Sequence, residues 1–144
     1  MTPTSREAAH LYEQALGADV RRSGGVFYTP AHLVEQLLDL TLEPLLAEAS
    51  DPLALRILDP SCGAGLFLAA AAERIAARAG VAVEAAYGCL IGVDVDPDAV
   101  ALARGLLPGA DLRVGDGLLA DVAGVDAVLG NPPFLSQLRS RTAT

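Results

Sequence analysis

The sequence predicts an α/β fold in which helices cover both faces of a parallel sheet. Short apolar runs that end in acidic or polar residues alternate with longer helical segments through the last two thirds of the chain. Hydrophobic residues make up 52% of the 144 residues and charged residues 19%, which supports a buried core and excludes a disordered chain.

Two helices are expected before the first strand. Residues 5–16 form the first helix, with Ser5 as its N-cap and Gly17 at its end. Its apolar face is formed by Ala8, Leu11 and Ala15. Thr29 and Pro30 open the second helix as its cap and its first helical residue. The apolar stripe of that helix consists of Leu33, Leu37, Leu38 and Leu42.

Four strands and two further helices follow in alternation. The predicted strands are residues 53–59, 90–95, 112–114 and 126–129. A helix over residues 66–79 ends at Gly80, and Asp96 caps another that begins at Pro97. Parallel sheets of this kind bind ligands at the carboxyl ends of their strands. The polar residues at or just beyond those ends are Asp59, Asp94, Asp116 and Asn131. They form a candidate site, although strand ends are normally polar in any case.

The turn Asp59-Pro60-Ser61-Cys62-Gly63-Ala64-Gly65 joins the first strand to its helix. Gly63 and Gly65 allow the backbone to approach a ligand, and the following helix begins with unpaired N–H groups. Leu68 stands where a dinucleotide-binding fingerprint has its third glycine, which weakens a nicotinamide or flavin interpretation. A glycine turn that only reverses the chain is the alternative.

Asp94 and Asp116 are the carboxylates expected to bind parts of a nucleoside. A carboxylate at the position of Asp94 accepts from the hydroxyls of a ribose. Asp116, between two glycines, accepts from an adenine amino group or simply forms an Asp-Gly turn.

The tetrapeptide Asn131-Pro132-Pro133-Phe134 is the most specific feature of the chain. The two prolines restrict the backbone, so Asn131 presents a stiffly mounted amide. Its side-chain oxygen and the carbonyl of Pro132 can accept both hydrogens of an aryl amine, and Phe134 offers a stacking surface. A proline-rich loop that merely leaves the sheet is the alternative.

A second aromatic segment, residues 26–30, contains Phe27 and Tyr28 just before Thr29 and Pro30. It forms either a flap over a bound ligand, hinged at the preceding glycines, or a hydrophobic staple around the helix start.

Bulk composition limits the partners and the location. A net charge of −8 opposes binding of a phosphate backbone by this chain alone. Cys62 and Cys89 are expected to be free packed thiols, and no Cys/His cluster indicates a metal. No transmembrane span or secretory signal is recognised, so a cytoplasmic location is expected.

The chain resembles the gamma-type DNA adenine methyltransferases of restriction and phage-defence systems. The resemblance runs from about residue 24 to Phe134. It is carried by the ordered motifs Gly-Val-Phe-Tyr-Thr-Pro, Asp-Pro-Ser-Cys-Gly-Ala-Gly, Gly-Val-Asp-Val-Asp-Pro, Gly-Asp-Gly and Asn-Pro-Pro-Phe. It implies a Rossmann-like fold that binds S-adenosyl-L-methionine (SAM) and transfers its methyl group to the exocyclic amine of adenine in DNA, without a covalent enzyme intermediate.

The resemblance also implies roles for individual residues. The cofactor would be bound by Phe27, Tyr28, Thr29, Pro30, Asp59, Pro60, Gly63, Gly65, Asp94 and Asp116. The target adenine, flipped out of DNA, would be held by Asn131, Pro132 and Phe134. Residues 1–50 would form a helical segment with the cofactor-capping motif, and residues 51–144 a partial methyltransferase domain.

Family catalytic domains continue past the Asn-Pro-Pro-Phe motif, so the fold is expected to lack its later strands and the isolated chain to be inactive. DNA would be bound mostly by regions outside this chain, with a specificity or restriction subunit as a partner. Gly117 departs from the large apolar residue that often follows the position of Asp116. The alternatives are methylation of protein glutamine or of guanine in ribosomal RNA, and a non-catalytic SAM-binding module.

Overall fold

In a computed structural model of the chain, the described residues form one sheet of four parallel strands in the order β3-β2-β1-β4. The structure describes residues 2–20 and 29–132. The strands are β1 (Ile57–Asp59), β2 (Leu90–Asp94), β3 (Asp111–Val114) and β4 (Ala127–Val128). The predicted parallel α/β sheet is therefore confirmed. β1 is shorter than predicted because the 3-10 turn η1 (Pro52–Ala54), capped by Asp51, occupies the start of that run.

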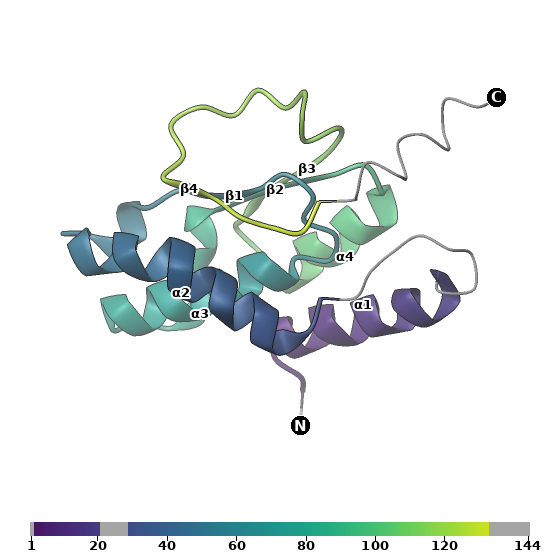
Figure 1. The fold of residues 1–144 in the computed structure, drawn as a ribbon, viewed down its shortest axis with the longest axis horizontal. Helices are drawn as coiled ribbons and strands as arrows, with labels where there is room; N and C mark the ends of the chain where they lie inside the picture. The colour runs from purple at the N-terminus through teal and green to yellow at the C-terminus, as the bar shows by residue number, and fades with distance from the viewer. Residues whose placement is uncertain (1, 21–28, 133–144) are drawn as a thin grey trace.

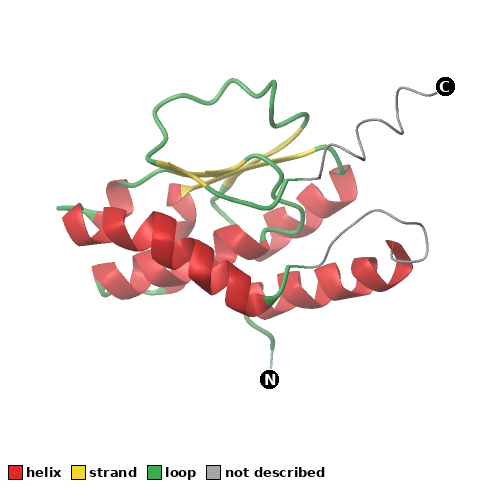
Figure 2. Ribbon diagram, viewed as in Figure 1, coloured by secondary structure: helices red, strands yellow, loops and turns green. Residues whose placement is uncertain are grey.

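The described α-helices all lie on the same side of this sheet (Figures 1 and 2). They are α1 (Ser5–Val20), α2 (Ala31–Glu48), α3 (Leu66–Ala79) and α4 (Pro97–Leu106), and a 3-10 segment, η2 (Val83–Cys89), leads into β2. The bounds of α3 agree with the prediction, since the glycines flanking it, Gly65 and Gly80, adopt left-handed backbone conformations. Asp96 caps α4 as expected and accepts from the N–H of Asp98 at 2.9 Å.

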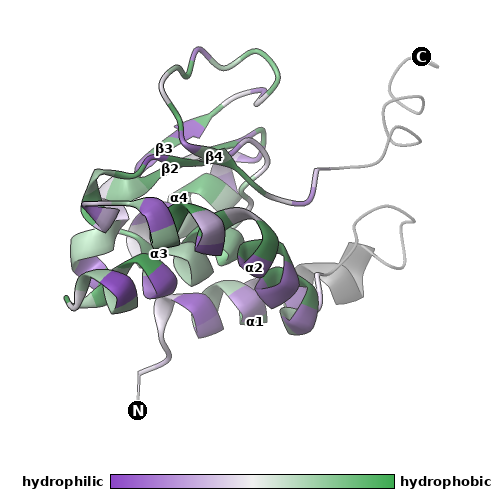
Figure 3. Ribbon diagram, turned by 60° about the vertical axis from the view of Figure 1, so that its left-hand side comes forward, coloured by the Kyte–Doolittle hydropathy of each residue, from purple (hydrophilic) through white to green (hydrophobic). Residues whose placement is uncertain are grey.

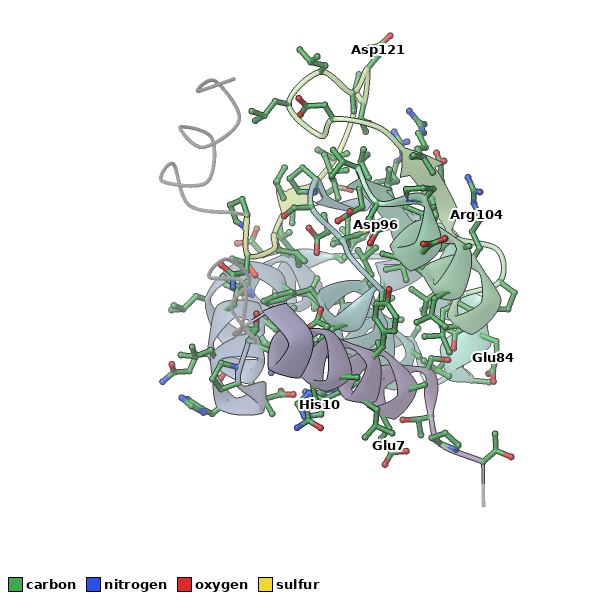
Figure 4. The ribbon with its side chains drawn as sticks, turned by 90° about the vertical axis from the view of Figure 1, so that its right-hand side faces the viewer. Glu7, His10, Glu84, Asp96, Arg104 and Asp121 are labelled. Carbon is green, nitrogen blue, oxygen red and sulfur yellow. The ribbon has the colours of Figure 1, made fainter. Side chains whose placement is uncertain are left out.

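The opposite face of the sheet is covered by the connection from β3 to β4, residues 115–126 (Figure 1). Its Ala120, Val122 and Val125 pack on Leu58, Ile91 and Val93 of the strands. Figure 4 places Asp121 of this connection at the end of the molecule opposite Glu7 of α1. Helices therefore cover one face only among the described residues. The connection contains three glycines, which disfavour a helix there.

The first helix packs through a different face from the predicted one. Ala9 is buried and Tyr12 packs against the core, whereas Leu11 is 58% exposed. The N-cap is Thr4, whose hydroxyl accepts from the N–H of Glu7, and Ser5 instead donates to the carbonyl of Leu106 in α4. The helix also continues through the predicted stop to Val20.

Arginine ion pairs join the three N-terminal helices. Arg6 of α1 pairs with Glu35 of α2 and with Glu73 of α3. Arg74 of α3 also pairs with Glu35. Figure 3 shows hydrophobic segments in green where the helices meet the sheet and hydrophilic segments in purple along α1. No helix among the described residues is long and apolar enough to cross a bilayer.

Candidate functional site

The glycine turn after β1 is held in place by backbone hydrogen bonds. The N–H of Cys62 donates to the carbonyl of Val93 in β2 at 2.9 Å, and that of Gly65 donates to the carbonyl of Cys62 at the same distance. Gly63 and Gly65 have φ values of +54° and +92°. A Cβ on Gly65 would lie 2.9 Å from Leu107, so a side chain would also push against the core. The turn thus requires glycine and leads straight into the N-terminus of α3.

Asp94, at the end of β2, bonds to the glycine turn. One carboxylate oxygen accepts from the N–H of Gly63 at 2.8 Å, and the other accepts from the N–H of Asp96 at 2.9 Å. Sequence reasoning assigned Asp94 to a ribose and missed this positioning role. Each carboxylate oxygen has two acceptor sites, so the bonds leave capacity for ligand hydroxyls.

Asp59, at the end of β1, is a buried carboxylate that is only partly satisfied. Its side chain is 1% exposed, and Oδ1 accepts from the N–H of Ser61 at 3.0 Å. Among the described residues, Oδ2 of Asp59 and the hydroxyl of Ser61 have no hydrogen-bond partner. Burial raises the pKa of Asp59 to about 7, and the negative charges of Asp94 and Glu13 contribute in the same direction. Such a group requires a hydrogen-bond donor when charged.

Gly130 brings the loop after β4 directly onto this carboxylate. Its φ is +139°, and a Cβ at this position would lie 2.4 Å from Oδ1 of Asp59. Only glycine allows the backbone to pass so closely over Asp59. The next residue, Asn131, therefore follows directly on a backbone that passes over Asp59, where the adjacent strands β1 and β4 end.

Asn131 is fixed by a hydrogen bond to the beginning of α2. Its Nδ2 donates to the hydroxyl of Thr29 at 3.0 Å, and Thr29 is buried while Asn131 is exposed. The predicted capping role of Thr29 is wrong: Pro30 is the N-cap, and no side chain caps α2. Because the amide nitrogen is engaged, its oxygen is the atom left to face a ligand.

The remaining predicted site residues fall into two groups. Pro132 is exposed beside Asn131, and Pro30 is half-buried beside Thr29. Phe27, Tyr28, Pro133 and Phe134 lie outside the described residues, so their predicted contacts stay predictions.

Asp116 forms the turn that was considered as an alternative to adenine binding. It is exposed, and its Oδ1 accepts from the N–H of Leu118 at 2.9 Å. The following Gly117 explains the departure from a large apolar residue, because a Cβ there would lie 1.9 Å from the carbonyl oxygen of Pro60. The segment of Asp116 is thus packed onto the turn that contains Gly63.

Both cysteines are buried free thiols, as predicted. Burial, followed by the charges of Asp59 and Asp94, raises the pKa of the Cys62 thiol to about 12. The thiol therefore stays protonated at neutral pH and is a packing group beside the site rather than a nucleophile.

Glu13 of α1 is a residue that sequence reasoning missed. Its carboxylate oxygen lies 3.7 Å from the position that a Cβ of Gly63 would occupy. Burial raises the pKa of Glu13 to about 7. The available signal was its place on the inward face of α1, four residues after the buried Ala9.

The chain is similar to known methyltransferases. The model of the N-6 DNA methylase family matches residues 7–144. An adenine-specific methyltransferase, PglX, of Streptomyces coelicolor is 33% identical over 69% of this chain and 9% of its own length. The type II methyltransferase M.XamI of Xanthomonas campestris pv. amaranthicola is 33% identical over 89% of this chain and 23% of its own. The methylase subunit of the type I restriction enzyme MjaIX of Methanocaldococcus jannaschii is 31% identical over 86% of this chain and 22% of its own. The chain thus spans less than a quarter of each of these relatives.

Solved structures show the same fold. A putative class I SAM-dependent methyltransferase from Listeria monocytogenes has a TM-score of 0.63 and 23% identity, over 96% of this chain and 43% of that one. A modification subunit of a putative type I restriction enzyme from Vibrio vulnificus has a TM-score of 0.53 and 26% identity, over 82% of this chain and 25% of that one.

Proposed function

This chain belongs to the N-6 DNA methylase family, and we propose that it carries the cofactor-binding and amine-holding part of an enzyme that methylates the exocyclic amine of adenine in DNA. The observation that supports this most is the pairing of Asn131 with Thr29 next to the Asp59 carboxylate. It joins the predicted substrate motif to the predicted cofactor motif.

The described residues fit SAM as the methyl donor. Gly63 and Gly65 leave the backbone bare at the start of α3, and Asp94 stands at the adjacent strand end with acceptor capacity for a ribose. Asp59 and Ser61 hold buried polar atoms that have no partner within the part of the chain that the structure describes. When bound, SAM supplies an electrophilic methyl group on a positively charged sulfur. We assign the cofactor-binding roles to the residues predicted from the sequence, with Asp94 also positioning the turn.

Asn131 would hold the amine that receives the methyl group. With its nitrogen tied to Thr29, the amide directs its oxygen toward one amine hydrogen, and the carbonyl of Pro132 accepts the other. Two acceptors on one amine draw its lone pair out of ring conjugation, so no strong base is required. The catalytic contribution of these residues is orientation and electrostatics.

The partners are proposed from the family. DNA is the proposed substrate, bound mostly through protein outside this chain because the net charge here is −8. The type I relative is a methylase subunit, which supports a proposed assembly with other subunits. A cytoplasmic location stays a prediction. The family match gives no support to protein glutamine or ribosomal RNA as substrates.

Substitution of Asn131 tests the proposed function in the complete protein. Asn131→Ala should lower methyl transfer to DNA by at least about a hundredfold, because it removes an acceptor that acts on the reacting amine. SAM affinity, measured by calorimetry, should stay within about threefold of wild type. Mass spectrometry of nucleosides from cells that express the gene should detect N6-methyladenine. Normal turnover in the variant, or methylation only on guanine or protein, would contradict the proposal.

A further inference from the structure

Glu13 approaches the glycine turn from an element far away in the sequence. Its carboxylate oxygen lies 3.7 Å from the Cβ position of Gly63, whose N–H donates to Asp94. The neighbouring Tyr12 lies within electrostatic reach of Asp94, since burial and then the charges of Asp96, Asp98 and Asp94 raise the pKa of its phenol. The side chain of Glu13 thus faces the glycine turn.

The carboxylate of Glu13 has no compensating partner among the described residues. Burial raises its pKa, and among the described residues no cation or hydrogen-bond donor opposes that shift. A second carboxylate, Asp59, senses the charge of Glu13 and has one fully buried oxygen without a partner. Asp94 adds a third negative group nearby. Desolvated acids held together without cations are costly, so this arrangement favours a positively charged ligand.

We propose that Glu13 accepts a hydrogen bond from the α-ammonium group of the methionine part of SAM, so that α1 forms one wall of the cofactor site. The inference rests on the proposed function, because it presupposes that the glycine turn binds this cofactor. It makes Glu13 a ligand-binding residue in a segment that precedes every recognised motif.

The ammonium group fits these acceptors better than the sulfonium group does. An ammonium carries three N–H donors, whereas a sulfonium carries charge but no donor hydrogen. The unsatisfied atoms are oxygens of carboxylate and hydroxyl groups, which need donors as well as positive charge. Hydrogen bonds between charged groups are also roughly twice as strong as neutral ones.

Binding of three ligands to the complete protein tests the inference. They are SAM, S-adenosylhomocysteine, which lacks the sulfonium charge, and an analogue of S-adenosylhomocysteine with hydrogen in place of the α-amino group. Glu13→Gln keeps the size of the side chain and removes its charge. We expect this substitution to lower the affinity for S-adenosylhomocysteine at least about tenfold. The amine-free analogue should bind wild type and variant with equal affinity. Glu84→Gln, an exposed residue of η2, makes the same charge change as a matched control and should leave all three affinities unchanged.

Stability measurements separate a binding role from a structural one. Without ligand above pH 7, Glu13→Gln should be at least as resistant to thermal unfolding as wild type, because it removes a half-buried charge that has no partner among the described residues. A residue that only supports the fold would lose stability on substitution. Glu13→Asp provides a second variant that keeps the charge, and it should lose less affinity for S-adenosylhomocysteine than Glu13→Gln.

The outcomes distinguish a failure of the Glu13 assignment from a failure of the proposed function. If wild type binds S-adenosylhomocysteine and Glu13→Gln binds it equally well, the inference is wrong and the proposed function stands. The ammonium assignment also fails if the variant loses affinity for SAM but retains it for S-adenosylhomocysteine. If wild type binds neither ligand, the cofactor claim of the proposed function is itself wrong.

Discussion

The side-chain amide of Asn131 donates a hydrogen bond of 3.0 Å to the hydroxyl of Thr29, which precedes it by 102 residues. This bond joins the start of α2 to the loop after β4. It selects one orientation of the amide by engaging the nitrogen, so the oxygen is presented away from the buried hydroxyl. Two motifs that are far apart in the sequence therefore act as one positioning device.

Replacement of Thr29 by valine should disturb the orientation of the Asn131 amide without preventing cofactor binding. Thr29→Val removes the acceptor and leaves the amide free to rotate, so methyl transfer by the complete protein should fall about two- to tenfold, as expected for about 0.5–1.5 kcal/mol. The dissociation constant for SAM should change less than the turnover rate. Thr29→Ser keeps the hydroxyl and should retain most activity. A larger loss in Thr29→Ser than in Thr29→Val would mean that the methyl group of Thr29, rather than its hydroxyl, matters.

Gly130 should tolerate no side chain. In Gly130→Ala the new Cβ would start 2.4 Å from Oδ1 of Asp59, in a backbone conformation that L-residues rarely adopt. We expect a loss of about 2–4 kcal/mol in the free energy of unfolding, measured by urea denaturation. Gly80→Ala is the matched control, because Gly80 also has positive φ but nothing lies within 4 Å of its Cβ position. It should cost only about 1 kcal/mol. Similar losses in both variants would argue against close packing on Asp59.

Gly117 and Gly115 offer a second matched pair of substitutions, in the connection from β3 to β4. Gly117→Ala would place a Cβ 1.9 Å from the carbonyl oxygen of Pro60, whereas Gly115→Ala meets nothing within 4 Å. We expect the first variant to shift the Asp116 segment away from the glycine turn and to weaken SAM binding several-fold. The second should bind SAM as wild type does. Calorimetric titration of both variants measures this difference, and unchanged binding in Gly117→Ala would show that the contact is not required.

The buried carboxyls should give the ligand-free protein a distinctive pH dependence. Burial raises the pKa values of Asp59 and Glu13 to about 7, whereas unfolded carboxyls titrate near about 4. The folded state therefore holds extra protons between these values, and their stabilising contribution is fully present below about pH 4. It is lost as pH rises toward and through 7. Cation binding needs the charged form, so SAM affinity should increase over the same interval.

Asp59→Asn isolates part of this effect. The decrease in unfolding free energy between about pH 5 and pH 7.5 should be smaller in Asp59→Asn than in wild type, because one titrating group has been removed. Urea denaturation at several pH values measures both slopes, and subtraction cancels the contribution of the other acidic groups. Parallel slopes would contradict a raised pKa at this position.

Local signals predicted the parts of the fold that depend on neighbouring residues. Gly65 and Gly80 mark the ends of α3 because both adopt left-handed conformations that glycine favours. Asp96 marks the start of α4 because its side chain satisfies a free N–H group. The ends of β1 and β2 were predictable because each apolar run in the sequence stops at an acidic residue, Asp59 or Asp94.

Features that depend on tertiary contacts were not predictable in this way. The periodicity of α1 permits more than one inward face, and only packing against α3 and α4 selects the face with Glu13. Thr29 resembles a helix cap in sequence, but its hydroxyl bonds to Asn131 instead. The close approaches at Gly117 and Gly130 likewise involve residues far away in the sequence, Pro60 and Asp59.

Among the described strands, β4 is an edge strand, and this affects the solubility expected of the protein. Among the described strands, Ala127 and Val128 pair with β1 alone, and Val128 is 56% exposed. The backbone N–H and C=O groups on the outer edge of these residues can form hydrogen bonds with an extended segment of another molecule. Concentrated samples of this chain should therefore self-associate through the exposed edge of β4. A peptide or subunit that pairs with β4 as a neighbouring strand should suppress this self-association.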